Sequence, residues 1–244
     1  MSSDRLRARI YAAYTSATNA PLAPDTLDGF APRAAHLNRL IAEHFPADRS
    51  ARILELGCGH GALLHFARKA GYANMSGVDG SPAQVAAAER LGIPGVRKGD
   101  LMGALRETPE ASLDAVVAFD VLEHLTRDEI LDAVDAIHRA LKPGGRLILH
   151  VPNGSSPFGT LMIYSDLTHE VAFTPESLAQ LFLASGWRKI ECFEDPPAVH
   201  GLKSRVRALL WRAIRAALRF YLAVETGSRA HTVLTQNLYA VAVK

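Results

Sequence analysis

The sequence contains little cysteine and no long uninterrupted apolar run. Cys58 and Cys192 are the only cysteines among its 244 residues, which excludes a disulfide framework and a cysteine-rich metal site. No run approaches the roughly 18 apolar residues of a membrane-spanning helix, and the first residues lack the apolar core of a secretory signal. We therefore expect a globular protein of the cytoplasm.

Acidic residues are absent from one segment, 203–224, although the whole chain has a net charge of only +2. Apolar residues recur there at helical spacing, and aromatic side chains (Trp211, Phe220 and Tyr221) accompany six basic residues. A stripe formed by Arg205, Arg212, Arg215 and Arg219 predicts a helix lying peripherally on the inner, anionic face of a membrane. Packing against the body or a second copy is the alternative, and the wide apolar face does not favour nucleic acid.

From residue 51 onward, short apolar strands alternate with helices, which predicts a Rossmann-like, doubly wound parallel sheet. Residues 1–50 are expected to form a helical cap region, and 51–244 the main domain with 203–224 as an insertion. The predicted strands are Ala51–Leu56, Asn74–Val78, Val96–Lys98, Leu113–Phe119 and Arg146–Val151, followed by closing strands at Trp187–Phe193 and Thr235–Val243.

A glycine-rich turn, Gly57-Cys58-Gly59-His60-Gly61, lies between the first predicted strand and its helix. Parallel α/β sheets bind ligands at this edge, where glycine lets the backbone approach a ligand closely. Asp79 follows Gly57 by 22 residues at the end of the second strand, where a carboxylate can bind ribose hydroxyls. The turn alone would also fit a nicotinamide cofactor.

Acidic residues at the strand ends argue against a nicotinamide dinucleotide as the ligand. Glu55 precedes the glycines, Asp100 ends the third strand, and Asp120 and Glu123 follow the fourth. These acids would repel a diphosphate but suit a ligand that carries a sulfonium and an ammonium.

These motifs resemble those of class I S-adenosylmethionine-dependent methyltransferases over about residues 50–151. The resemblance implies a seven-stranded sheet with an antiparallel last strand, and S-adenosylmethionine as cofactor. It also implies three groups of cofactor-binding residues: Glu55, Gly57, Cys58, Gly59 and Gly61 at the methionine part; Asp79 and Gly80 at the ribose; and Asp100 and Leu101 at the adenine, flanked by Phe119, Asp120 and Val121. Arg33 is a candidate for the cofactor carboxylate.

Histidines near the strand ends (His60, His124, His150 and His169) are candidates for a catalytic base. We favour His124, in a segment similar to ubiquinone-pathway O-methyltransferases, and His169. Asp166 would orient His169 or contact the acceptor. In relatives of the ubiquinone-pathway O-methyltransferases, the acids and the histidine of this segment can hold a divalent cation. The corresponding residues here are Asp120, Glu123 and His124, but we predict no metal at them.

The stretch from Asp166 to Leu178 resembles methyltransferases found with bacterial surface-polysaccharide enzymes. It favours O-methylation of a hydroxyl on a glycan or glycolipid. The alternatives are a quinone precursor or other aromatic small molecule, and a catalytically silent partner subunit that binds the cofactor. An aromatic acceptor would need an aromatic-lined pocket, for which Phe158, Tyr164 and Phe173 are available.

Overall fold

The computed structural model describes residues 6–7, 9–10, 22–197, 199, 201–227 and 233–244. One seven-stranded sheet with the order β3-β2-β1-β4-β5-β7-β6 forms its centre. Its strands are parallel except β7, which pairs antiparallel with both β5 and β6. The strands are β1 (Ile53–Leu56), β2 (Met75–Asp79), β3 (Val96–Lys98), β4 (Leu113–Phe119), β5 (Leu141–Pro152), β6 (Lys189–Glu194) and β7 (Asn237–Val243).

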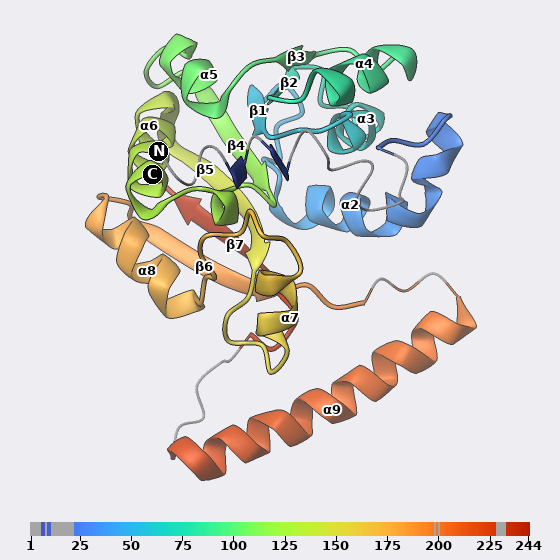
Figure 1. Cartoon of the computed structure of the whole chain (residues 1–244), viewed down its shortest axis with the longest axis vertical. Helices are drawn as coiled ribbons and strands as arrows, with labels where there is room; N and C mark the ends of the chain where they lie inside the picture. The colour runs from blue at the N-terminus through green and yellow to red at the C-terminus, as the bar shows by residue number, and fades with distance from the viewer. Residues whose placement is uncertain (1–5, 8, 11–21, 198, 200, 228–232) are drawn as a thin grey trace.

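Helices cover both faces of the sheet (Figure 1). Adjacent residues of a strand point to opposite faces, so Ile53 packs with α2, α3 and α4, whereas Leu54 packs with α5, α6 and α8. The helices are η1 (Leu27–Phe30), α2 (Ala31–His44), α3 (Ala62–Lys69), α4 (Pro82–Arg90), α5 (Leu101–Glu107), η2 (Leu122–His124), α6 (Arg127–Ala140), α7 (Gly159–Tyr164), α8 (Pro175–Ala184) and α9 (Leu202–Thr226).

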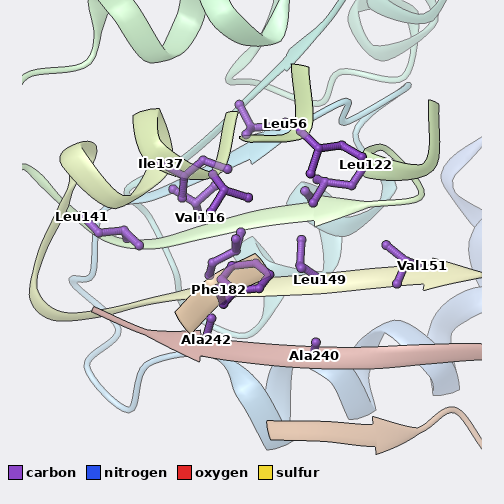
Figure 2. Packing of buried hydrophobic residues seen from close by; sticks show 14 of the residues in the cluster. Leu56, Val116, Leu122, Ile137, Leu141, Leu149, Val151, Phe182, Ala240 and Ala242 are labelled. Carbon is purple, nitrogen blue, oxygen red and sulfur yellow. The ribbon is translucent and has the colours of Figure 1, made fainter. Parts of the chain in front are cut away.

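The larger apolar cluster fixes the carboxyl ends of the central strands. Figure 2 shows Val116 of β4 and Leu149 of β5 packed beside Ile137 of α6 and Phe182 of α8, all at most 1% exposed. The start of α6 is fixed locally by a capping box, in which Thr126 and Glu129 satisfy each other's backbone N–H. Strand ends at the site are therefore held by a dense core.

The expected boundary between residues 50 and 51 is not a boundary of packing. Phe30, Leu37 and Ile41 belong to the same buried cluster as Ile53 of β1. Residues 30–45 therefore pack into the buried cluster on one face of the sheet, while most of residues 1–21 lie outside the described part of the chain.

The inserted helix α9 lies between β6 and β7 and stands away from the sheet (Figure 1). Of the arginines in the stripe expected at a membrane surface, Arg215 forms an ion pair with Glu194, and Arg219 lies 4.0 Å from that same carboxylate. These two arginines thus face the body, because Glu194 at the end of β6 is largely buried and needs a counter-charge. No helix among the described residues is long and apolar enough to cross a membrane.

Candidate active site

The glycine turn after β1 has a backbone that only glycine adopts easily. Gly57, Gly59 and Gly61 have φ angles of +66°, +54° and +80°. A Cβ on Gly57 would lie 2.5 Å from Val121 Cγ2, so the turn touches the segment that follows β4. The missing side chain at Gly57 therefore leaves room for the segment after β4. A backbone without side chains also allows a ligand to approach closely.

Asp79 holds this turn in place from the end of β2. Its Oδ2 accepts a hydrogen bond of 2.8 Å from the Gly59 N–H, and its Oδ1 accepts one of 2.8 Å from the Ser81 N–H. A carboxylate has about four acceptor positions, so Asp79 retains capacity for two hydroxyl groups. Cys58 packs instead against the sheet, because its side chain fills the space left by the missing side chain of Gly77.

Glu55 is a buried acid without a complete set of partners. It is 3% exposed, and its Oε2 has no hydrogen-bond partner among the described residues. Burial raises the pKa of Glu55 well above its usual range, the positive charge of Arg33 opposes that rise, and Asp79 adds to it. An orphaned acid near a cation matches the ammonium and carboxylate of an amino acid, so the residues present fit the methionine part of S-adenosylmethionine.

Asp100, expected at the adenine, also has a local structural role. Its Oδ1 accepts a hydrogen bond of 2.6 Å from the Gly103 N–H and caps α5, which begins at Leu101. Its side chain is 74% exposed, so the cap leaves it open to a ligand. Gly80 has an open neighbourhood, with Gly99 O 4.0 Å from the position of a Cβ.

The chain turns sharply after β4 at Asp120, which has a φ angle of +55°. A residue other than glycine at such a φ angle carries backbone strain, and residues strained in this way are enriched at functional sites. Asp120 Oδ1 lies 2.5 Å from His150 Nδ1 of β5, and Phe119 stacks on the His150 ring with centroids 4.1 Å apart. The segment Phe119–Val121 thus links the glycine turn to the end of β5.

A cavity of about 530 Å³ opens beside this segment. Its lining comes from parts of the chain that are far apart in sequence, and acids and histidines form much of it: Ile10, Asp120, Glu123, His124, Pro152, Met162, Ser165, Asp166, Leu167, His169 and Asn237. All three predicted catalytic residues, His124, His169 and Asp166, line this one cavity. The aromatic candidates Phe158, Tyr164 and Phe173 are not part of its lining.

The hydrogen bonds of Thr168 determine the tautomer of His124. The Thr168 hydroxyl donates its single proton to Asp166 Oδ1 over 2.7 Å, and it lies 2.8 Å from His124 Nδ1. The imidazole must therefore donate from Nδ1, which makes Nε2 its basic nitrogen. Burial lowers the pKa of His124, and the neighbouring His169 adds to this. Asp166 reaches His124 through Thr168, and its charge also acts on His169.

His169 is oriented by a second contact. Its Nδ1 lies 3.0 Å from the backbone carbonyl of Met162, an oxygen that only accepts, so Nε2 of His169 is also basic. The rings of His124 and His169 are 4.7 Å apart. Glu123 is the third member of this group, with ligating atoms of all three within 4.8 Å. Burial and the charge of Asp120 raise the pKa of Glu123 to about 8.

The sequence analysis did not find the buried group around His150. His150 is 3% exposed and lies between Asp120 and Asp195. Burial opposes its charged form, but the hydrogen bond with Asp120 and the negative charge of nearby Asp195 raise the pKa of His150 to about 9. The His150 and Asp195 positions are 45 residues apart, so no local spacing signals their contact.

The described N-terminal residues close one side of the cavity. Arg7 donates a hydrogen bond of 2.9 Å to the backbone carbonyl of His124 and forms an ion pair of 2.9 Å with Glu129. This pairing lowers the pKa of Glu129 to about 2. Ile10 then reaches the cavity wall.

A Rossmann-like seven-stranded sheet with an antiparallel β7, and a glycine turn with acids at the strand ends, define a class I methyltransferase. The sequence profile of the methyltransferase domain family matches residues 30–192. The chain therefore belongs to this family, and it is an S-adenosylmethionine-dependent methyltransferase.

Solved structures show the same fold. An S-adenosylmethionine-dependent methyltransferase from Archaeoglobus fulgidus is 19% identical, with a TM-score of 0.68 over 96% of this chain and 99% of its own. Phosphoethanolamine N-methyltransferase 2 of Haemonchus contortus, in complex with S-adenosyl-L-methionine, is 19% identical, with a TM-score of 0.57 over 86% of this chain and 52% of its own.

A curated relative matches a shorter region. The human tRNA N(3)-cytidine methyltransferase METTL2B is 29% identical over 98 residues, which is 36% of this chain and 26% of that protein. The chain thus matches only about a quarter of that relative's length. S-adenosylmethionine is the cofactor of the present chain, and the acceptor has to be inferred from the site.

Proposed function

We propose that this methyltransferase O-methylates a hydroxyl on a glycan or glycolipid. The observation that supports this is the lining of the 530 Å³ cavity, where acids and histidines stand around His124 and His169. Carboxylates and imidazoles bind sugar hydroxyls by hydrogen bonds. The lining also has apolar side chains (Ile10, Pro152, Met162 and Leu167) but, among the described residues, no Phe, Tyr or Trp ring on which a phenol or quinone would stack. The aromatic candidates lie elsewhere: Phe173 is buried in the core, and Phe158 and Tyr164 are 62% and 79% exposed.

The residues of the chain have three tasks in this reaction. S-adenosylmethionine, held by the glycine turn with Glu55 and Asp79, supplies an electrophilic methyl group. Asp120, which lines the cavity next to the cofactor side, would position the hydroxyl. His169 or His124, each with a basic Nε2, would accept the hydroxyl proton as the new bond forms.

We further propose that α9 binds an anionic bilayer and brings the site to a lipid-linked acceptor. Its exposed apolar side chains include Leu209, Phe220 and Val224, at 66%, 73% and 69% exposure. Exposed basic residues Arg205, Arg207 and Arg212 accompany them. This combination of an apolar face with cations supports binding to acidic lipid headgroups.

Apolar residues are also exposed in and after α7, the helix that contributes Met162 to the cavity lining. Leu161, Tyr164 and Leu167 are between 62% and 79% exposed, and Leu167 is part of the lining. A lipid-linked acceptor would place its glycan among the acids and histidines of the cavity, while its lipid lies near these exposed apolar side chains.

The acceptor class is tested with radiolabelled methyl transfer to three pools: lipid-linked and polymeric glycans, catechol-type phenols, and tRNA. We expect incorporation into the glycan pool. His169→Ala or His124→Ala should lower turnover by roughly 100-fold without a change in S-adenosylmethionine affinity. His138→Ala, a histidine that packs on Trp187, is the matched control. Transfer to phenol or tRNA alone would contradict the proposal.

Bilayer binding is tested by sedimentation with anionic and with zwitterionic vesicles. The triple variant Arg205→Glu, Arg207→Glu, Arg212→Glu should lose binding to anionic vesicles. A second triple variant with the same charge change on other surfaces, Lys69→Glu, Arg90→Glu, Lys98→Glu, should retain it. Equal binding of both variants would contradict the role of α9.

A further inference from the structure

Three metal-ligating side chains from three separate elements converge outside the acceptor cavity. They are His36 of α2, His150 of β5 and Asp195, which follows β6, and their ligating atoms lie within 4.8 Å of one another. His36 Nδ1 is 3.3 Å from Asp195 Oδ1, and His150 Nε2 is 3.6 Å from Asp195 Oδ2. None of the three is part of the cavity lining.

These separations agree with the dimensions of a tetrahedral zinc site. Zinc binds imidazole nitrogens and carboxylate oxygens at about 2.0–2.2 Å, so neighbouring ligands of a tetrahedron lie about 3.3–3.6 Å apart. Each imidazole lies at such a distance from one oxygen of Asp195, His36 Nδ1 from Oδ1 and His150 Nε2 from Oδ2, so an ion between them would draw one of these oxygens toward itself. They also exceed the usual length of a strong charge-assisted hydrogen bond.

One of the ligating atoms is buried and lacks a hydrogen-bond partner. His150 is 3% exposed, and within the described part of the chain its Nε2 has no hydrogen-bond partner. Buried polar atoms are normally satisfied, and an ion shared with the other two residues would satisfy this nitrogen by displacing its proton.

Each of the three residues is also held from behind by another group. Asp120 lies 2.5 Å from His150 Nδ1, the Tyr239 hydroxyl lies 2.7 Å from His36 Nε2, and Arg39 donates a hydrogen bond of 2.6 Å to Asp195 Oδ1. Outer partners of this kind fix the ring orientation of metal-binding histidines. The Arg39 cation opposes a second positive charge, whereas Asp120 and Asp195 favour it.

We propose that His36, His150 and Asp195 bind one Zn²⁺ ion or a similar borderline divalent cation, with water or an anion as the fourth ligand. Two imidazoles and a carboxylate favour such ions over Mg²⁺ or Ca²⁺, which prefer oxygen ligands. The ion would join α2 to β5 and to the segment that leads into α9. Through the His150–Asp120 contact it would also fix a residue of the acceptor cavity.

The test is metal content and zinc affinity of the full chain, purified without chelators and after tag removal. Elemental analysis should give about one zinc per chain. After the metal is removed, titration of Zn²⁺ against a chromophoric chelator should show one tight site. Asp195→Asn and His36→Ala should each weaken zinc binding by more than tenfold, and Tyr239→Phe, which removes an outer partner, by about tenfold.

The matched control is His169→Ala, which alters the other group of possible ligands, Glu123, His124 and His169. It should leave the zinc affinity unchanged. Thermal unfolding establishes that each variant is folded, and the visible spectrum of the Co²⁺-loaded unaltered protein reports four-coordinate geometry without any substitution. No saturable Zn²⁺ binding, or binding that His169→Ala abolishes and Asp195→Asn leaves intact, would overturn the proposal.

Discussion

The cofactor side and the acceptor side of this site are assembled in different ways. The cofactor side consists mainly of one contiguous run, Glu55–Gly61, with Asp79 on the neighbouring strand. The acceptor cavity draws on residues from Ile10 to Asn237, and its histidines are oriented by Thr168 and a carbonyl of α7. We therefore expect cofactor recognition to depend mainly on a short segment, and acceptor recognition to depend on tertiary packing.

The largest effect should come from a side chain on the glycine turn. Gly57→Val should lower S-adenosylmethionine affinity by more than about 100-fold, because a Cβ would lie 2.5 Å from Val121 Cγ2 and the positive φ adds strain. Gly92→Ala is the control, since it has a φ of +68° but nothing within 4 Å of its Cβ. Calorimetric titration measures both, and equal affinities would mean that the turn does not hold the cofactor.

A smaller loss is expected from Asp79→Ala. It should weaken S-adenosylmethionine binding by about 1–3 kcal/mol, the cost of removing paired hydrogen bonds. The thermal midpoint separates this from a merely structural effect, because Asp79 also holds Gly59 and Ser81. Full affinity in the folded variant would remove Asp79 from the cofactor site.

On the acceptor side, Glu123→Gln should change the pH dependence of stability. The folded chain binds the Glu123 proton more tightly, because the pKa of Glu123 is about 8 there and the ordinary pKa of a glutamate side chain is 4.5. Stability of the unaltered chain therefore falls as pH rises from about 4.5 to 8. Gln cannot ionise, so the variant should gain relative stability between pH 5 and pH 8.

Each kcal/mol of that gain would raise the midpoint by about 2–4 °C in a domain of this size. Thermal unfolding at both pH values measures the difference between variant and unaltered protein. The same difference at pH 5 and pH 8 would show that Glu123 is not protonated in the folded chain.

The smallest effect is expected from Asp100→Ala. Loss of the helix cap on α5 should cost about 1 kcal/mol of stability. If Asp100 also binds the adenine, cofactor affinity falls as well, and Asp100→Ser, which can still cap, would restore the stability without the affinity. Thermal unfolding together with calorimetry separates the two roles, and an unchanged midpoint would contradict the cap.

Strands and caps were predictable where the signal is local. The apolar run Leu113–Phe119 was predicted with its observed bounds, and the capping box of Thr126 and Glu129 at the start of α6 is a local sequence motif of the same kind. The sequence analysis missed α5, because Asp100 was interpreted as a ligand-binding residue and not as a cap. β5 also begins earlier than predicted, since Leu141 pairs with Leu113 before the turn at Gly144.

The side-chain contacts that the sequence analysis did not predict join residues far apart in the chain. Asp166 was expected to orient His169 or to contact the acceptor, and its hydrogen bond with Thr168, which links it to His124, was not foreseen. The contacts of His150 with Asp120 and Asp195 join β4, β5 and the end of β6, and no spacing in the sequence encodes them. Arg215 was expected to belong to a stripe on an anionic membrane surface, yet it pairs with the buried Glu194.

The most direct test of the account is calorimetric titration of the unaltered chain, Asp79→Ala and His169→Ala with S-adenosylhomocysteine. We predict one site per chain, weakened by Asp79→Ala and unchanged by His169→Ala, because the cofactor and acceptor sides are separate. Absence of binding to the folded, unaltered chain, or an equal loss in both variants, would contradict it.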